Sequence, residues 1–214
     1  MRKLIPGLAV LAAAVAFSVW AYPHLPARVA THFDLHGEPN GWSSRFWAAV
    51  LMPLIVLGLA VMFAVLPKID PRQANYAKFG STYWTIANAT LILTSLIQVV
   101  VLGKALGWAF DATRVAFAAV GLLIALIGNL MTRVRPNWFV GIRTPWTLSS
   151  DTVWRKTHRF GGFAFVVAGL GMAVAALLAG RSALPWALAA VGAAALTSIV
   201  YSYVVWRGEQ EAKP

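Results

Sequence analysis

The chain has 214 residues, of which 59% are hydrophobic and only 12% are charged, about half the charged fraction of soluble domains, so the composition predicts an integral membrane protein. The absence of cysteine excludes disulfides, thiolate metal sites and a cysteine nucleophile. The net charge of +11 would suggest nucleic-acid binding in a soluble protein, but here the basic residues flank apolar runs, where membrane topology accounts for them, and we expect no direct nucleic-acid partner.

Six apolar runs come close to or exceed the ~20 residues that a helix needs to cross a bilayer. They predict an all-α integral membrane fold, a polytopic bundle of six transmembrane helices. The first run could also be a signal peptide, but its length favours a spanning helix. Pro53 should kink the second run unless a neighbouring group bonds the carbonyl that proline leaves free. The runs are residues 4–21, 47–66, 84–106, 115–132, 160–179 and 183–206.

The distribution of lysine and arginine predicts the orientation of the bundle. With both termini in the cytoplasm, the inner connectors and termini carry 13 of the 18 basic residues. Cytoplasmic segments of membrane proteins are enriched in such residues. We therefore expect residues 133–159 to form a cytoplasmic loop and residues 22–46 to lie outside. The five outer residues are Arg28, Arg45, Lys104, Arg114 and Arg181.

The outer segment carries a possible metal site. In an extended strand His32, Asp34 and His36 would project from one face, and imidazole with carboxylate is a reasonable Zn²⁺ ligand set. Alternatively, Asp34, His36 and Glu38 are the solvated approach to a turn at residues 39–41. The HExxH spacing of metalloproteases is absent. The candidate outer-loop surface comprises His32, Asp34, His36, Gly37 and Trp42.

Polar and small residues predict which helix faces meet. Thr85, Asn88, Ser95 and Gln98 form a stripe along the third run, which should face other helices because polar groups are costly in hydrocarbon. Small residues suit close packing of the last two helices against each other. These are Gly161, Gly162, Ala164, Ala168, Gly169, Ala173, Ala189, Gly192 and Ala193.

The inner segment 133–159 reads as a folded element rather than a tether. Residues 137–142 are too apolar for a loop surrounded by water, and Gly141 and Pro145 stand where tight turns would be needed. Arg143 beside Trp146 suits recognition of carboxylate, phosphate or peptide backbone. Asn75 and Tyr76 in the other inner connector could pack against this segment.

The second part of this segment predicts a short helix. Ser149 or Ser150 can cap it, and it would run from Asp151 to His158, with Val153 and Trp154 in the headgroup layer. Ser149, Ser150, Asp151 and His158 invite a hydrolase interpretation, but helix-end roles explain them better. Asp70 in the other inner connector could pair with an arginine of this segment, or be a helix start or a solvated charge.

Two stretches resemble known sequences. The string GIRTPWTL at residues 141–148, followed by VW at 153–154 and THR at 157–159, resembles the signature of the SdpI family of bacterial membrane immunity proteins. In the first half, THFDLHGEPNGW at residues 31–42 and PKIDP at 67–71 resemble the domain of unknown function that precedes this signature. Together the resemblances cover nearly the whole chain.

The resemblance implies one membrane domain, residues 1–214, with an N-terminal half 1–110 and an SdpI-like half 111–214. It implies a multi-pass, non-enzymatic protein of the bacterial cytoplasmic membrane, without a cofactor, that contacts lipids and protects its cell from a membrane-active peptide toxin. In the family's best-known member the protein also holds a cytoplasmic transcriptional repressor at the membrane.

We expect toxin or partner binding at Asn137, Gly141, Arg143, Thr144, Pro145, Trp146, Trp154, His158 and Arg159. Two other interpretations remain open: a small transporter or lipid-binding protein, and a metal-dependent membrane hydrolase. Charged residues lining a water-filled cavity would favour transport, and a bound metal with an open coordination position would favour the hydrolase.

Overall fold

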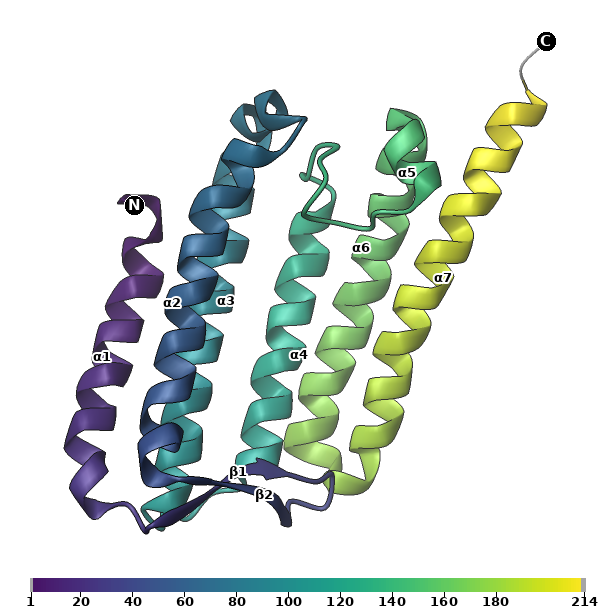
Figure 1. Ribbon diagram of the computed structural model, residues 1–214. Coiled ribbons are helices and arrows are strands. Elements are labelled where there is room, and N and C mark those ends of the chain that lie inside the picture. Colours follow the sequence, from purple (N-terminus) through teal and green to yellow (C-terminus); the bar gives the residue numbers. More distant parts are fainter. Residues whose placement is uncertain (1, 213–214) are drawn as a thin grey trace.

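A computed structural model describes residues 2–212. Six helices are long and apolar enough to cross a membrane, which confirms the predicted fold class. Figure 1 shows them side by side, with both termini at one end and a β-hairpin at the other. We call these the inner and outer ends. The elements are η1 Arg2–Leu4, α1 Ile5–Ala21, η2 Tyr22–His24, β1 Arg28–Phe33, β2 Pro39–Ser44, α2 Arg45–Ile69, η3 Gln73–Asn75, α3 Tyr76–Ala105, α4 Ala112–Met131, α5 Pro145–Ser149, α6 Asp151–Val174, the π-helical turn η4 Ala175–Ala179, η5 Arg181–Ala183 and α7 Leu184–Glu211.

The helix expected over residues 151–158 and the fifth span are one element. α6 begins at Asp151, and the Ser150 hydroxyl caps it by accepting a hydrogen bond from the Val153 N–H. The cap at Ser150 was predicted. The short helix was expected to end at His158, but it continues without interruption into the fifth span, because basic residues on one exposed face do not interrupt a helix. Val153 and Trp154 are both buried against protein, and their depth at the headgroup layer stays a prediction.

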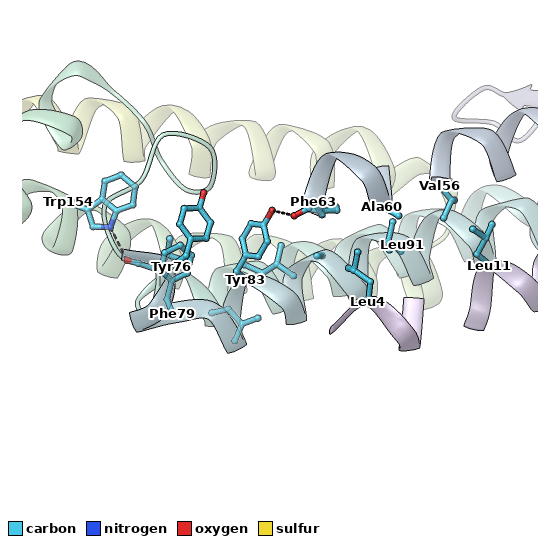
Figure 2. Close-up of a cluster of buried hydrophobic side chains, with 14 residues drawn as sticks. Leu4, Leu11, Val56, Ala60, Phe63, Tyr76, Phe79, Tyr83, Leu91 and Trp154 are labelled. Atoms are coloured by element: carbon cyan, nitrogen blue, oxygen red, sulfur yellow. Dashed lines mark hydrogen bonds between the residues drawn. The ribbon is translucent and has the colours of Figure 1, made fainter. Parts of the chain in front are cut away.

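The main core lies between α1, α2 and α3 and extends to the inner end. Figure 2 shows Leu4 of η1 and Leu11 of α1 packed near Val56 and Ala60 of α2, with an aromatic cluster beyond them. In that cluster the Tyr76 and Tyr83 rings meet edge to face at 5.2 Å. Trp154 of α6 joins the same core, which ties the second half of the chain to the first.

Both prolines inside α2 leave carbonyls that side chains of α3 bond. Pro53 has no N–H for the Ala49 carbonyl, and Nε2 of Gln98 donates to that oxygen at 3.1 Å. Pro67 likewise frees the Phe63 carbonyl, which accepts from the Tyr83 hydroxyl at 2.8 Å. Figure 2 shows this second bond. A neighbouring side chain therefore bonds the carbonyl that Pro53 leaves free, which is the condition under which Pro53 was expected not to kink its helix.

The polar stripe of α3 mostly faces other helices, as predicted. The amide of Asn88 accepts from the Gly7 N–H at 2.9 Å and donates to the Lys3 carbonyl at 2.8 Å. Ser95 and Gln98 are buried. Thr85 is the exception, because it is exposed and its hydroxyl bonds back to Ser81 within its own helix.

Glycines bring α6 against α4, not chiefly against α7 as predicted. A Cβ atom on Gly169 would lie 2.5 Å from the Gly121 carbonyl oxygen, and one on Gly162 would lie 2.7 Å from that of Gly128. Gly161 does face α7, near Ser198, but Gly192 of α7 has open space around it. α6 also packs along α7, so the prediction was incomplete: it did not match the two glycines of α4, seven residues apart, to those of α6.

The hairpin crosses the outer end and is fastened at its tip. Arg181 donates to the Asp111 carboxylate at 2.8 Å and to the His36 carbonyl. Burial would raise the pKa of Asp111, but hydrogen bonds from Arg181 and the Arg114 N–H outweigh it and lower that pKa below its ordinary value. The hairpin is thereby bound to the starts of α4 and η5. We call these contacts the outer clasp.

Candidate functional site

Residues 133–150, the part of the inner segment that precedes α6, are folded around the side-chain amide of Asn137. Asn137 is fully buried, and its Oδ1 accepts from the N–H groups of Phe139 and Val140 at 2.9 and 2.7 Å. Its Nδ2 donates to the carbonyls of Arg135 and Val140, both at 2.9 Å. One side chain therefore uses its full hydrogen-bonding capacity to close this turn.

The connector between α2 and α3 holds the same turn from the other side. The buried Asp70 carboxylate accepts from the Trp138 N–H and the Tyr76 hydroxyl, each at 2.9 Å. Asn75 donates to the Pro136 carbonyl at 2.7 Å. Asn75 and Asp70 thus pack against the segment as expected, but Asp70 bonds backbone N–H groups and the Tyr76 hydroxyl rather than an arginine side chain. The arginine that bridges the two is Arg72, which donates to the Leu148 carbonyl at 2.8 Å.

His158 fixes the end of the turn on α6. Its Nδ1 lies 2.8 Å from the Trp154 carbonyl, so this nitrogen carries the proton, and its Nε2 accepts from the Ile142 N–H at 3.1 Å. Gly141 makes room for the ring, because a Cβ there would lie 2.3 Å from Nε2, and its φ of +116° favours glycine. The ring also stacks on Trp154 at 4.0 Å. His158 and Gly141 therefore act together as one structural unit.

The short helix α5 attaches the segment to α7. The Thr144 hydroxyl accepts from the Thr147 N–H at 3.1 Å, and the Thr147 hydroxyl accepts from the Thr144 N–H at 2.9 Å, which makes a reciprocal cap. Thr144 also lies 3.0 Å from the Ser202 hydroxyl. Pro145 occupies the first helical position. Thr147 was missed in the sequence because the usual partner in such a cap is Glu or Gln.

The remaining inner candidates separate into buried and exposed groups. Trp154 is 1% exposed, and its indole N–H donates to the Val134 carbonyl at 2.9 Å. Trp146 is half-buried, with its ring 5.1 Å from that of Tyr203. Arg143 is exposed, and its guanidinium donates one hydrogen bond to the Trp138 carbonyl at 2.7 Å. Arg159 is exposed on α6 near the inner end. The indoles therefore support the fold, and the two arginines can meet a partner.

The residues that suggested a hydrolase are used elsewhere. The Ser149 hydroxyl donates to the Trp146 carbonyl at 3.0 Å, and the Ser150 hydroxyl donates to Glu209 at 2.7 Å. Asp151 is exposed in the first turn of α6. Both ring nitrogens of His158 bond backbone groups. These four side chains form no nucleophile and base pair.

The outer candidates lie on or beside the hairpin. His32 bonds the Asn40 side chain across the strands. The Asp34 carboxylate caps the tip by accepting from the N–H groups of Glu38 and His36, which lowers its pKa below the ordinary value. His36 Nδ1 is 3.6 Å from Asp34. Gly37 takes the positive φ of the tip, and Trp42 is 53% exposed.

This arrangement gives the predicted zinc set no geometric support. Among residues 2–212, no three His, Asp or Glu side chains are grouped so that they could hold a metal ion. His32 is turned toward β2, while Asp34 is occupied by the tip of the hairpin. The three residues lie on a bulged strand and its turn rather than on one flat strand, which explains the difference.

Comparison with known proteins agrees with both resemblances in the sequence. Residues 133–202 match the SdpI/YfhL protein family, and residues 9–57 match a domain of unknown function, DUF1648. The chain is 27% identical over 181 residues to the immunity protein SdpI of Bacillus subtilis (strain 168). This alignment covers 85% of the chain and 84% of that protein. No solved structure matches the chain.

Proposed function

We propose that this homologue of the immunity protein SdpI, whose residues 133–202 carry the SdpI/YfhL family sequence, protects its bacterium from a membrane-active peptide toxin. It is a multi-pass protein of the bacterial cytoplasmic membrane. Its partners in this role are membrane lipids and the toxin, and the protein acts by binding rather than by catalysis.

The observation that carries the proposal is the rigid hydrogen-bonded framework of the inner segment. Asn137, Asp70 and His158 hold it rigidly through backbone groups, while Arg143 and Trp138 remain exposed. A connector that served only to orient the helices would need positive charge but not this framework. A surface that is held in one conformation loses little entropy when it binds a partner.

We extend the proposal to signalling at the inner end. Toxin binding at the outer hairpin or the helix faces would favour one arrangement of the bundle over another, and the inner segment would then present a different surface. The guanidinium of Arg143 has donors left to bond a carboxylate or peptide carbonyl on a cytoplasmic transcriptional repressor. Such coupling requires the toxin to bind the two arrangements with different affinities.

Immunity is tested by complementation. A Bacillus subtilis strain that lacks its immunity protein SdpI would express this chain and be exposed to the toxin that SdpI counters and, separately, to culture supernatant of this chain's own source bacterium. We expect survival to rise at least about tenfold over the empty vector against one of the two. Normal membrane abundance without protection against either would overturn the proposal.

Arg143→Lys separates hydrogen bonding from charge at the inner segment. The variant keeps the positive charge but loses the planar fork, so we expect lower repressor recruitment at unchanged membrane abundance. Lys78→Arg, at an exposed inner-end position on α3, is the matched control and should behave as the parent. If Arg143→Lys both protects cells and recruits the repressor like the parent, directed bonding by Arg143 is not part of the function.

A further inference from the structure

A basic cavity of about 520 Å³ lies at the inner end, between the segment that follows α4 and the first two turns of α6. Arg135, Arg155, Lys156 and Arg159 line it, and Trp154 and His158 contribute to its wall. The volume is in the range of small-ligand sites. No acidic side chain belongs to its lining.

The four cations of this cavity have no counter-charge in the described part of the chain. The ion pairs found among residues 2–212 are His36 with Asp34, Arg181 with Asp111, and Arg207 with Glu211. Within the cavity, Arg155 donates to the Thr152 hydroxyl at 3.1 Å, a neutral partner. Four like charges around one cavity repel one another unless an anion neutralises them. All four side chains are exposed, so solvent screens this repulsion in part, and an anion bound among them would lower it further.

Membrane topology alone does not explain this convergence. Positive charge anywhere at the inner end would orient the helices equally well. Arg133 and Lys78 show this, because both are exposed at the same end and neither lines the cavity. Three of the four cavity cations instead occupy one face of a single helix, at positions 155, 156 and 159.

The same face of α6 becomes apolar and exposed toward the outer end. Phe163 follows Arg159 by one turn and is 73% exposed, and Leu170, two turns further, is 48% exposed. A molecule held by the cations would thus have hydrocarbon-facing protein surface directly beside it. This order of charge and then apolar surface fits a phosphate headgroup with acyl chains.

We propose that the cavity binds the phosphate of an anionic membrane phospholipid, with its acyl chains along Phe163 and Leu170. Guanidinium groups bond phosphate oxygens in pairs, so Arg155 and Arg159 are the main donors, and Arg135 closes the site from the segment that follows α4. A zwitterionic lipid carries the same phosphate, but its own cation is repelled by the surrounding charges. The inference does not depend on the immunity function.

Native mass spectrometry of the purified full chain in neutral detergent tests the site. The probes are 1-palmitoyl-2-oleoyl phosphatidylglycerol, the phosphatidylcholine with the same chains, and inorganic phosphate. We expect phosphatidylglycerol to bind about tenfold or more tightly than phosphatidylcholine. The double variant Arg155→Gln with Arg159→Gln should weaken phosphatidylglycerol at least about tenfold, the effect expected from losing a charge-assisted bond.

The matched control is Arg133→Gln with Lys78→Gln, which removes the same charge from exposed inner-end positions outside the cavity and should bind like the parent. Arg155→Lys with Arg159→Lys keeps the charge and should retain most of the binding. Phe163→Gln should weaken phosphatidylglycerol but leave inorganic phosphate unaffected, which separates lipid from free anion.

Three results would overturn the proposal. Equal weakening of phosphatidylglycerol binding by the cavity pair and the control pair of Gln substitutions would show that binding depends only on net charge. Binding of inorganic phosphate without phosphatidylglycerol would assign the cavity to a soluble anion. Unchanged phosphatidylglycerol binding in the cavity pair, together with loss of repressor recruitment, would make this a protein-docking surface.

Discussion

At the scale of single residues, the inner segment depends on side chains that bond backbone. Asn137, Asp70 and His158 each bond backbone groups of the segment, and each is buried. A buried backbone group that loses its partner costs about 1–3 kcal/mol. The segment therefore resembles a piece of protein interior more than a surface loop.

We predict that Asn137→Ala lowers the free energy of unfolding by about 2–4 kcal/mol, because the N–H groups of Phe139 and Val140 lose their acceptor. Thermal unfolding in detergent and the rate of proteolysis within residues 133–150 would measure this. Asn129→Ala is the control, since Asn129 is exposed on α4 and should change stability by no more than about 0.5 kcal/mol. Equal effects of the two substitutions would contradict this account of the segment.

The sequence predicts part of the packing of the inner segment. It predicted that residues 137–142 are too apolar for a loop surrounded by water and must pack against something, and it named the connector carrying Asp70 and Asn75 as one candidate. It gave Asp70 the wrong partner, since backbone N–H groups have no signature in a sequence. It also treated Trp154 as an apolar anchor of the segment, but its contact with the core of the first half could not be predicted, because an indole suits a headgroup layer and a protein interior equally well.

At the scale of elements, α2 and α3 are coupled through the prolines of α2. Nε2 of Gln98 also bonds the Ala48 carbonyl and the Ser18 hydroxyl, both at 3.0 Å, so one amide joins α1, α2 and α3. Run length and apolarity predict six spans, because crossing hydrocarbon requires both. They do not identify such pairs of helices, which depend on two residues far apart in the sequence.

We predict that Gln98→Leu destabilises the bundle by about 1–2 kcal/mol, near the upper range for hydrogen bonds between membrane helices, because the Ala49 carbonyl is left without a donor. Pro53→Ala restores a backbone N–H to that carbonyl, so Gln98→Leu should cost less in the Pro53→Ala background. A double-mutant cycle of unfolding free energies measures the coupling. Strict additivity would show that the amide does not compensate for the proline.

We predict that Gly169→Ala separates α4 from α6 and costs about 1–3 kcal/mol, as overpacking does, because the new Cβ would lie 2.5 Å from backbone atoms of α4. Gly171→Ala, on the same helix with nothing within 4 Å, is the control and should be neutral or stabilising. The midpoint of thermal unfolding would compare them. Similar midpoints for both variants would rule out the close helix contact.

At the scale of the whole molecule, two sets of contacts join the halves of the chain at opposite ends. The outer clasp links the hairpin to Asp111 and Arg181, and the inner segment links α6 to the connector after α2. Both termini lie at the inner end, as an even number of spans requires (Figure 1). Which end faces the cytoplasm is a prediction from charge.

We predict that the inner end is cytoplasmic. Because the chain has no cysteine, Ser149→Cys and Glu38→Cys each introduce a single thiol at an exposed position. A membrane-impermeant maleimide should label Glu38→Cys in intact cells and Ser149→Cys only after the membrane is opened. Labelling of Ser149→Cys in intact cells would reverse the orientation.

The outer clasp also sets an order on biosynthesis. The hairpin leaves the ribosome early, but the His36 carbonyl at its tip cannot form its hydrogen bond until Arg181, 145 residues further along the chain, has been synthesised. At about 5–20 residues per second, that interval is roughly 7–30 s. During it the hairpin has been synthesised but Arg181 has not. Synthesis of η5 therefore completes the outer clasp, and a chain released before Arg181 lacks the residue that joins Asp111 to the hairpin.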